Sequence, residues 1–135
     1  MHTIGRKREQ GVMLLEALIG ILIFSLGILS MVAMQGLAIG YTADAKYRSD
    51  ASFLANEIIS TMWMDSANMA NYAYPGGTAT PLAAWVTRVT TILPQADAAI
   101  TVDTATGAVD VTLRWTPPNS AETRSYRTLS VVSGP

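Results

Sequence analysis

The sequence predicts an α+β fold, in which one long N-terminal helix packs on a small antiparallel β-sheet. Residues 12–34 include one charged side chain, that of Glu16. Proline is absent from residue 12 to residue 74, so a helix of roughly 55 residues, ending near Met69, meets no helix breaker. After Pro94 apolar residues alternate with polar ones, as they do in strands that bury one face.

The apolar run of residues 12–34 is long enough to cross a membrane. A helix of that length rises about 35 Å, and a bilayer core is about 30 Å thick. The basic residues Arg6, Lys7 and Arg8 precede the run. Because positive charge beside a span stays in the cytoplasm, we expect the C-terminal part of the chain to face outward.

Two residues at the start of the run have functional implications. Gly11 is the small residue at the boundary between the basic segment and the apolar run, whereas a secretory signal is cleaved after its apolar run. Cleavage after Gly11 would make Val12 the new N-terminus and Glu16 the fifth residue. A carboxylate there is costly in lipid, so we expect Glu16 to meet the free α-amine of a neighbouring subunit.

The segment Gly-Val-Met-Leu-Leu-Glu at residues 11–16, followed by an uncharged helix, resembles the prepilin signature of type IV pilins. Residues 14–29, with Met34 and Gln35, are similar to the PilV family of minor pilins, as are residues 48–62. Val12 stands where pilins usually begin with an N-methylated phenylalanine.

This resemblance implies the type IV pilin fold and three segments. Residues 1–11 would be the prepilin leader peptide, residues 12–40 the transmembrane and assembly half of the helix, and residues 41–135 a globular part. A prepilin peptidase would cleave after Gly11 and methylate Val12, and Glu16 would act in assembly.

The resemblance also implies a function and a location. The protein would be a minor type IV pilin that primes or modifies pili, with roles in twitching motility and adhesion. It would wait in the inner membrane as a single-pass protein, N-terminus in the cytoplasm and globular part in the periplasm, and then enter a pilus at the cell surface. Its partners would be the prepilin peptidase, other minor and major pilins, the inner-membrane assembly platform and the lipid bilayer.

Two alternatives share these features. A minor pseudopilin of a type II secretion system has the same leader, helix and glutamate, so residues 1–40 do not separate it from a pilin. An ordinary signal-anchored envelope protein is the other alternative, with Gly11 and Glu16 coincidental; it would retain residues 1–11.

Composition argues against other classes of function. The chain has 135 residues, one histidine (His2) and no cysteine. Triads of the Ser-His-Asp or Cys-His type are therefore excluded, and we predict no enzyme, cofactor or metal site. Without residues 1–11 the chain has 6 basic and 9 acidic residues, with no basic stripe, so nucleic acid is not an expected partner.

The globular part is predicted from periodicity. A stripe at helical spacing should pack on the sheet, and a second helix should have Thr80 as its N-cap, Pro81 as its first residue and an end before Pro94. The stripe consists of Tyr47, Ala51, Leu54, Ile58 and Met62. The apolar face of the second helix consists of Leu82, Trp85, Val86, Val89 and Leu93.

Strands are predicted at residues 99–104, 108–116 and 124–132, with a hairpin turn at residues 105–107. Leu113 and Trp115 should be buried against the stripe.

The acids Asp97, Asp103 and Asp110 suggest solvated turns more than a cation site. The tryptophans Trp63, Trp85 and Trp115 suggest core packing or subunit contacts more than a ligand platform. The small residues in the first half of the helix, among them Gly20, Gly27, Gly36 and Gly40, favour either close helix packing or a segment that bends.

Overall fold

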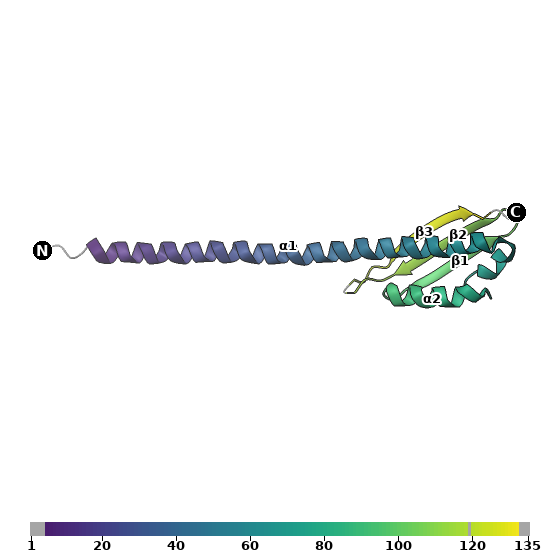
Figure 1. Ribbon diagram of the computed structural model, residues 1–135. Coiled ribbons are helices and arrows are strands. Elements are labelled where there is room, and N and C mark those ends of the chain that lie inside the picture. The colour runs from purple at the N-terminus through teal and green to yellow at the C-terminus, as the bar shows by residue number, and fades with distance from the viewer. Residues whose placement is uncertain (1–4, 119, 133–135) are drawn as a thin grey trace. The chain divides into compact units, whose positions relative to one another are not determined.

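The computed structural model describes residues 5–118 and 120–132, with side chains from residue 11 onward. One long N-terminal apolar helix is followed by a small three-stranded antiparallel sheet, which confirms the predicted α+β class. Figure 1 shows the elements in chain order. They are α1 (Gly5–Met64), the 3₁₀ helix η1 (Ser66–Tyr72), α2 (Thr80–Ile92), β1 (Asp97–Asp103), β2 (Ala108–Trp115) and β3 (Arg124–Val131).

The chain divides into two compact units, Met1–Thr42 and Ala43–Pro135, and α1 contributes residues to both. We call the second unit, residues 43–135, the head.

The end of α1 differs from the prediction. We expected helix to about Met69, but α1 ends at Met64 and η1 follows. Asp65 has non-helical backbone angles, φ −126° and ψ 43°. Its carboxylate accepts hydrogen bonds from Asn68 Nδ2 at 2.7 Å and from the Tyr72 hydroxyl at 3.1 Å. These bonds hold the tighter turn that follows, and Met69 and Tyr72 are thereby buried in the core.

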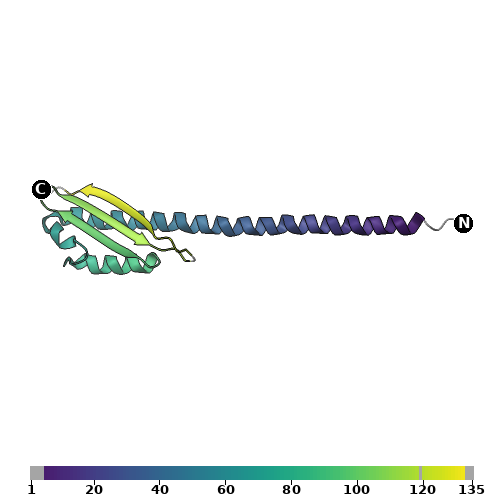
Figure 2. The same ribbon diagram turned by 180° about the vertical axis from the view of Figure 1, so that it is seen from behind.

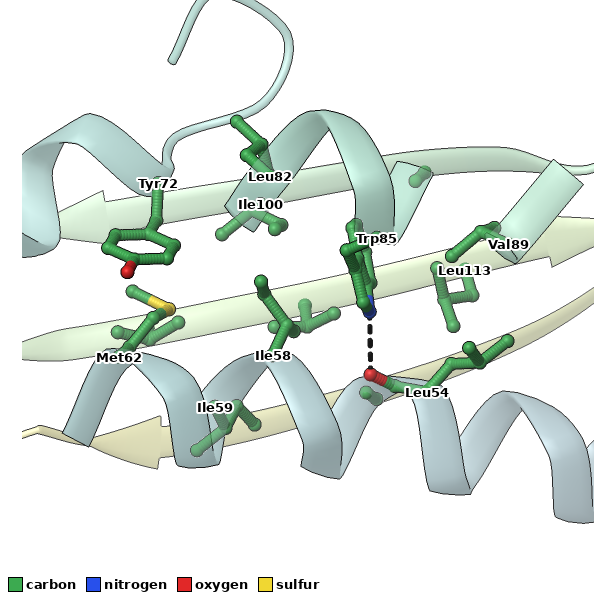
Figure 3. Packing of buried hydrophobic residues seen from close by; sticks show 14 of the residues in the cluster. Leu54, Ile58, Ile59, Met62, Tyr72, Leu82, Trp85, Val89, Ile100 and Leu113 are labelled. Carbon is green, nitrogen blue, oxygen red and sulfur yellow. Dashed lines mark hydrogen bonds between the residues drawn. The ribbon is translucent and has the colours of Figure 1, made fainter. Parts of the chain in front are cut away.

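The predicted stripe on α1 is confirmed. Ala51, Leu54, Ile58 and Met62 are all 1% exposed or less, and Tyr47 packs at the border of the core. Figure 3 shows the side chains of Leu54, Ile58 and Met62 on α1 facing the sheet and α2. Burial of one helix face against a sheet is the main source of stability in such a layer pair.

Helix α2 begins one residue earlier than predicted. Ala79, not Thr80, is the N-cap residue, and it has no side-chain capping bond. Its backbone N–H donates to the Asn71 carbonyl at 3.0 Å, and its carbonyl accepts from the Leu82 N–H at 3.0 Å, which places the first turn of the helix. Pro81 lies in that first turn, as expected, and α2 ends before Pro94.

The predicted apolar face of α2 packs into the core. Leu82, Trp85, Val89 and Leu93 are buried and Val86 is half-buried. The Trp85 indole Nε1–H donates to the Leu54 carbonyl at 2.8 Å, which joins α2 to α1 (Figure 3).

The sheet has the order β1-β2-β3, with both pairs antiparallel. β1 begins at Asp97 rather than at Ala99, because the register pairs Asp97 with Arg114 and an ion pair of 3.5 Å joins their side chains. Gly107 closes the predicted β1–β2 turn with φ +72°, and a Cβ there would lie 2.5 Å from the Val132 carbonyl oxygen. Glycine is therefore required at this position.

The alternation on β2 is confirmed: Val109, Val111, Leu113 and Trp115 are at most 1% exposed. The two predicted faces of β3 also differ in burial. Tyr126, Thr128 and Ser130 are half-buried and Val132 is buried, whereas Leu129 and Val131 are exposed.

The acids that we considered as a cation site are dispersed. Asp103 ends β1 at the β1–β2 turn and accepts bonds from the Thr106 hydroxyl and the Ala105 N–H, which lower the pKa of its carboxyl. Asp110 lies within β2, on the outer face of the sheet. The described residues hold no group of three side chains suited to a metal ion.

We expect Asp110 to make the stability of the head depend on pH. The Arg127 guanidinium, which donates from Nε at 2.9 Å, lowers the pKa of the Asp110 carboxyl. Because this pKa is lower in the folded than in the unfolded chain, where it is about 3.9, the stabilisation is present above about pH 4. It is lost as pH falls through the folded-state pKa. Urea unfolding at pH 7 and pH 3 should show a smaller difference in Asp110→Asn than in the wild type; an unchanged difference would contradict this role.

Candidate functional site: the apolar part of α1

The apolar part of α1, from Val12 to Thr42, leaves its side chains exposed. Large apolar side chains such as Leu14, Phe24 and Met34 are 67%, 69% and 71% exposed. Among the described residues, the fully buried core of the head begins at Ala51, and Tyr47 packs at its border. A continuous apolar surface of this size needs a lipid or protein environment to cover it.

By length and composition α1 is a candidate membrane span, and its most apolar segment is 0% buried within the chain. The position of this helix near the N-terminus agrees with a membrane anchor.

Hydroxyl groups in this part of α1 are satisfied by the helix itself. Ser25 donates to the Ile21 carbonyl at 2.7 Å, and Ser30 donates to the Leu26 carbonyl at 2.9 Å. In a bilayer core such internal bonds avoid the cost of an unpaired polar group. The serines therefore fit an apolar environment without a partner from outside the chain.

Glu16 differs from the serines. It is the one charged residue between residues 12 and 42, and it is exposed. The ion pairs among the described residues all join side chains at Asp44 or later positions. A partner for the Glu16 carboxylate within an apolar surrounding therefore has to come from another source, such as a free α-amine, a neighbouring chain or the lipid headgroups.

Gly11 and Val12 lie within α1, and the helix passes through them without a break. A Cβ on Gly11 would meet no atom within 4 Å, so nothing else in the described chain requires glycine there. Any requirement for a small residue would come from an external protein. Residues 1–4 of the predicted leader, with His2, lie outside the described residues.

Four glycines follow in the same part of α1, at positions 20, 27, 36 and 40. The helix is continuous through all of them, and a Cβ at any of the four would meet open space. The internal packing of the described chain therefore does not explain these glycines, which leaves close packing against other helices and local bending as their two interpretations.

Sequence reasoning missed an exposed apolar group on the part of α1 that belongs to the head. Phe53 is 68% exposed, Trp63 47% and Met64 83%. All three lie outside the buried stripe of α1. Their positions relative to this stripe are the sequence signal that would have identified them. Of the three tryptophans, Trp85 and Trp115 lie in the core, whereas Trp63 is available for contacts with another protein.

Open hollows lie on the described part of the head, and the two considered next have no catalytic or ligand-binding set of side chains. One of 420 Å³ is lined by η1 and the β1–β2 turn, and one of 470 Å³ is lined by residues 74–86 at the start of α2. The described residues lining them include no acidic or basic side chain.

Comparisons of the chain with protein-family models, with curated proteins and with solved structures find no match.

Proposed function

We propose that this protein is a minor type IV pilin, a subunit that helps prime or modify type IV pili. One observation supports the proposal most directly. An exposed apolar helix of membrane-spanning length contains one charged residue, Glu16, five positions after the glycine that ends a basic segment. A membrane anchor needs neither the glycine nor the carboxylate, whereas a cleaved subunit that assembles through its helix uses both.

Cleavage after Gly11 by a prepilin peptidase would create a positive α-amine at Val12, which the same enzyme would methylate. Glu16 lies four residues further on, which is about 6 Å along a helix axis. A neighbouring subunit displaced by about that distance would bring its amine to the Glu16 carboxylate. The pair would neutralise two charges in an apolar bundle and would favour one axial register between helices.

The proposed location follows from the charges on either side of the span. Arg6, Lys7 and Arg8 would hold the N-terminus in the cytoplasm, and the head would lie in the periplasm. The partners would be the peptidase, the assembly platform, other minor and major pilins and the bilayer. Incorporation into the pilus would then place the head at the cell surface, where twitching motility and adhesion depend on it.

Substitution of Gly11 tests the proposal. Gly11→Arg places a long charged side chain at the cleavage site, so we expect uncleaved protein that stays in the inner membrane. Gly11→Ala is the matched control, because alanine adds one methyl group in open space and should still be cleaved. The measurement is the intact mass of membrane-extracted protein. If Gly11→Arg and the wild type have the same N-terminus, the leader assignment is wrong.

A further inference from the structure

The apolar surface of α1 continues beyond the run of residues 12–34. The side chains of Leu37, Ile39 and Tyr41 are 63%, 71% and 74% exposed. No charged residue lies between Glu16 and Tyr41. In both ribbon views α1 is one unbroken helix through this stretch (Figures 1 and 2). The exposed apolar surface is therefore longer than the hydrocarbon core of a bilayer, which a helix of about 20 residues already crosses.

A helix with such a long apolar surface has two candidate depths in a bilayer. If the hydrocarbon core covered residues 12–34, its midplane would lie at Ile23. Glu16 would then lie about 5 Å inside the core, and the apolar side chains near Tyr41 would be left in water. If Glu16 and Tyr41 instead marked the two edges of the core, the midplane would lie midway between them, next to Ile28.

The spacing of Glu16 and Tyr41 matches the distance between the two headgroup layers of a bilayer. Tyr41 lies 25 residues after Glu16, which is about 38 Å along a helix axis, or about 35 Å at a typical tilt of about 20°. A hydrocarbon core is about 30 Å thick, and the headgroup regions increase this to about 40 to 45 Å. Both residues therefore fit a few ångströms outside the core at the same time, one in each headgroup layer.

The side chains at and between these two positions favour the second depth. A carboxylate is costly in hydrocarbon, and tyrosine is enriched where the hydrocarbon meets the headgroups, because its ring is apolar and its hydroxyl is polar. The hydroxyls of Ser25 and Ser30 bond to their own helix. Gln35 is the other polar side chain between Glu16 and Tyr41. The second depth thus places the uncharged amide of Gln35 in the core, which costs less than a carboxylate there.

We propose that Glu16 and Tyr41 set the depth of α1 in the membrane before assembly, by lying in opposite headgroup layers of the phospholipid bilayer. The Tyr41 hydroxyl would donate to a phosphate or ester oxygen of a phospholipid, and Leu37 and Ile39 would contact the acyl chains. This inference rests on the membrane anchor of the proposed function.

This depth bears on both the processing and the assembly in the proposed function. Gly11 lies five residues before Glu16, so it would be about 8 Å further toward the cytoplasm, outside the hydrocarbon core and within reach of a peptidase. The Glu16 carboxylate would leave the headgroups only when the helix enters a bundle. Its pairing with the α-amine of a neighbouring subunit would therefore begin at assembly.

Spin-label depth measurements on the full chain in vesicles of phosphatidylethanolamine and phosphatidylglycerol test the proposal. The chain has no cysteine, so one introduced cysteine carries the only nitroxide label. Ile23→Cys and Ile28→Cys form a matched pair, because each replaces an exposed isoleucine of α1. The collision rates of each label with oxygen and with a water-soluble nickel complex report its depth. We expect the label at 28 to lie deeper than the label at 23, whereas a core over residues 12–34 predicts the reverse.

Substitutions at the two proposed anchors show whether they set this depth. Glu16→Leu removes the charge and Tyr41→Ser removes the ring, so each should move the midplane toward residue 23, by up to about 8 Å. Glu16→Asp and Tyr41→Trp are the matched controls. They retain a carboxylate and an interfacial aromatic ring, so the label depths should stay those of the unsubstituted anchors.

The outcomes separate this inference from the proposed function. Equal depths at 23 and 28, a deeper label at 23, or unchanged depths in either Glu16→Leu or Tyr41→Ser would overturn the depth assignment alone. Dipolar broadening of a label at Ile39 would show that a second copy of the chain, not lipid, covers this stretch, and would overturn it too. Free collision of both labels with the nickel complex would show that α1 is no membrane anchor, which would overturn the proposed function as well.

Discussion

Glu16→Ala should be absent from sheared pili although it is inserted in the membrane and cleaved normally. In the proposed function, insertion and cleavage would precede assembly and would depend on the apolar run and on Gly11. Assembly would then leave the α-amine of a neighbouring subunit without its carboxylate in an apolar bundle. Insertion scales put the cost of a charged side chain at about 2.5 to 3.5 kcal/mol at the centre of a membrane helix, with less near its ends, so we expect loss of the proposed pair to impair assembly strongly. Immunoblots of the sheared and membrane fractions measure the outcome.

Glu16→Asp is the matched control for this prediction. It keeps the charge and shortens the side chain by one methylene group, so the recovery in pili should be intermediate. Wild-type recovery of Glu16→Ala in purified pili would leave Glu16 without an assembly role and would favour a carboxylate that reaches the lipid headgroups.

Trp115→Ala should unfold the head at a much lower temperature than the wild type. Trp115 is 1% exposed in a core that includes Leu113 and the α1 stripe, and replacing such a residue by alanine typically costs about 3 to 5 kcal/mol. A chain without cysteine has no disulfide to offset that loss. In a domain of this size the loss lowers Tm by more than about 10 °C. Thermal unfolding of the full chain in detergent measures the shift.

Phenylalanine substitutions provide controls at the two core tryptophans. Among the described residues the Trp115 Nε1–H has no hydrogen-bond partner, whereas the Trp85 Nε1–H donates to the Leu54 carbonyl at 2.8 Å. Trp115→Phe therefore loses ring volume alone, and Trp85→Phe also loses a buried hydrogen bond. We expect Trp85→Phe to lower Tm more. Unchanged Tm in Trp115→Ala would refute the packing of the head.

The parts of the fold that depend on side-chain period were predictable. The 3.6-residue period of Leu54, Ile58 and Met62 identifies the face of α1 that packs in the head, and the 2-residue period on β2 identifies the inner face of the sheet. Both periods have the same physical cause, because one face of each element is buried. The faces therefore followed from the sequence even where the strand ends were shifted by one or two residues.

The parts that depend on single polar contacts were not predictable. The end of α1 is set by the Asp65 carboxylate, which binds Asn68 and Tyr72 beyond it. The start of β1 is set by the pairing of Asp97 with Arg114. The proposed roles of Gly11, Val12 and Glu16 come mainly from the sequence, since their proposed partners are other proteins.

The N-terminus of the protein extracted from membranes is the most direct test of the central claim. Intact mass together with N-terminal peptide mapping defines it without any substitution. We expect a chain that begins at Val12, lacks residues 1–11 and has one methyl group on its α-amine. A chain that retains residues 1–11 would be that of a signal-anchored protein and would contradict the proposed function.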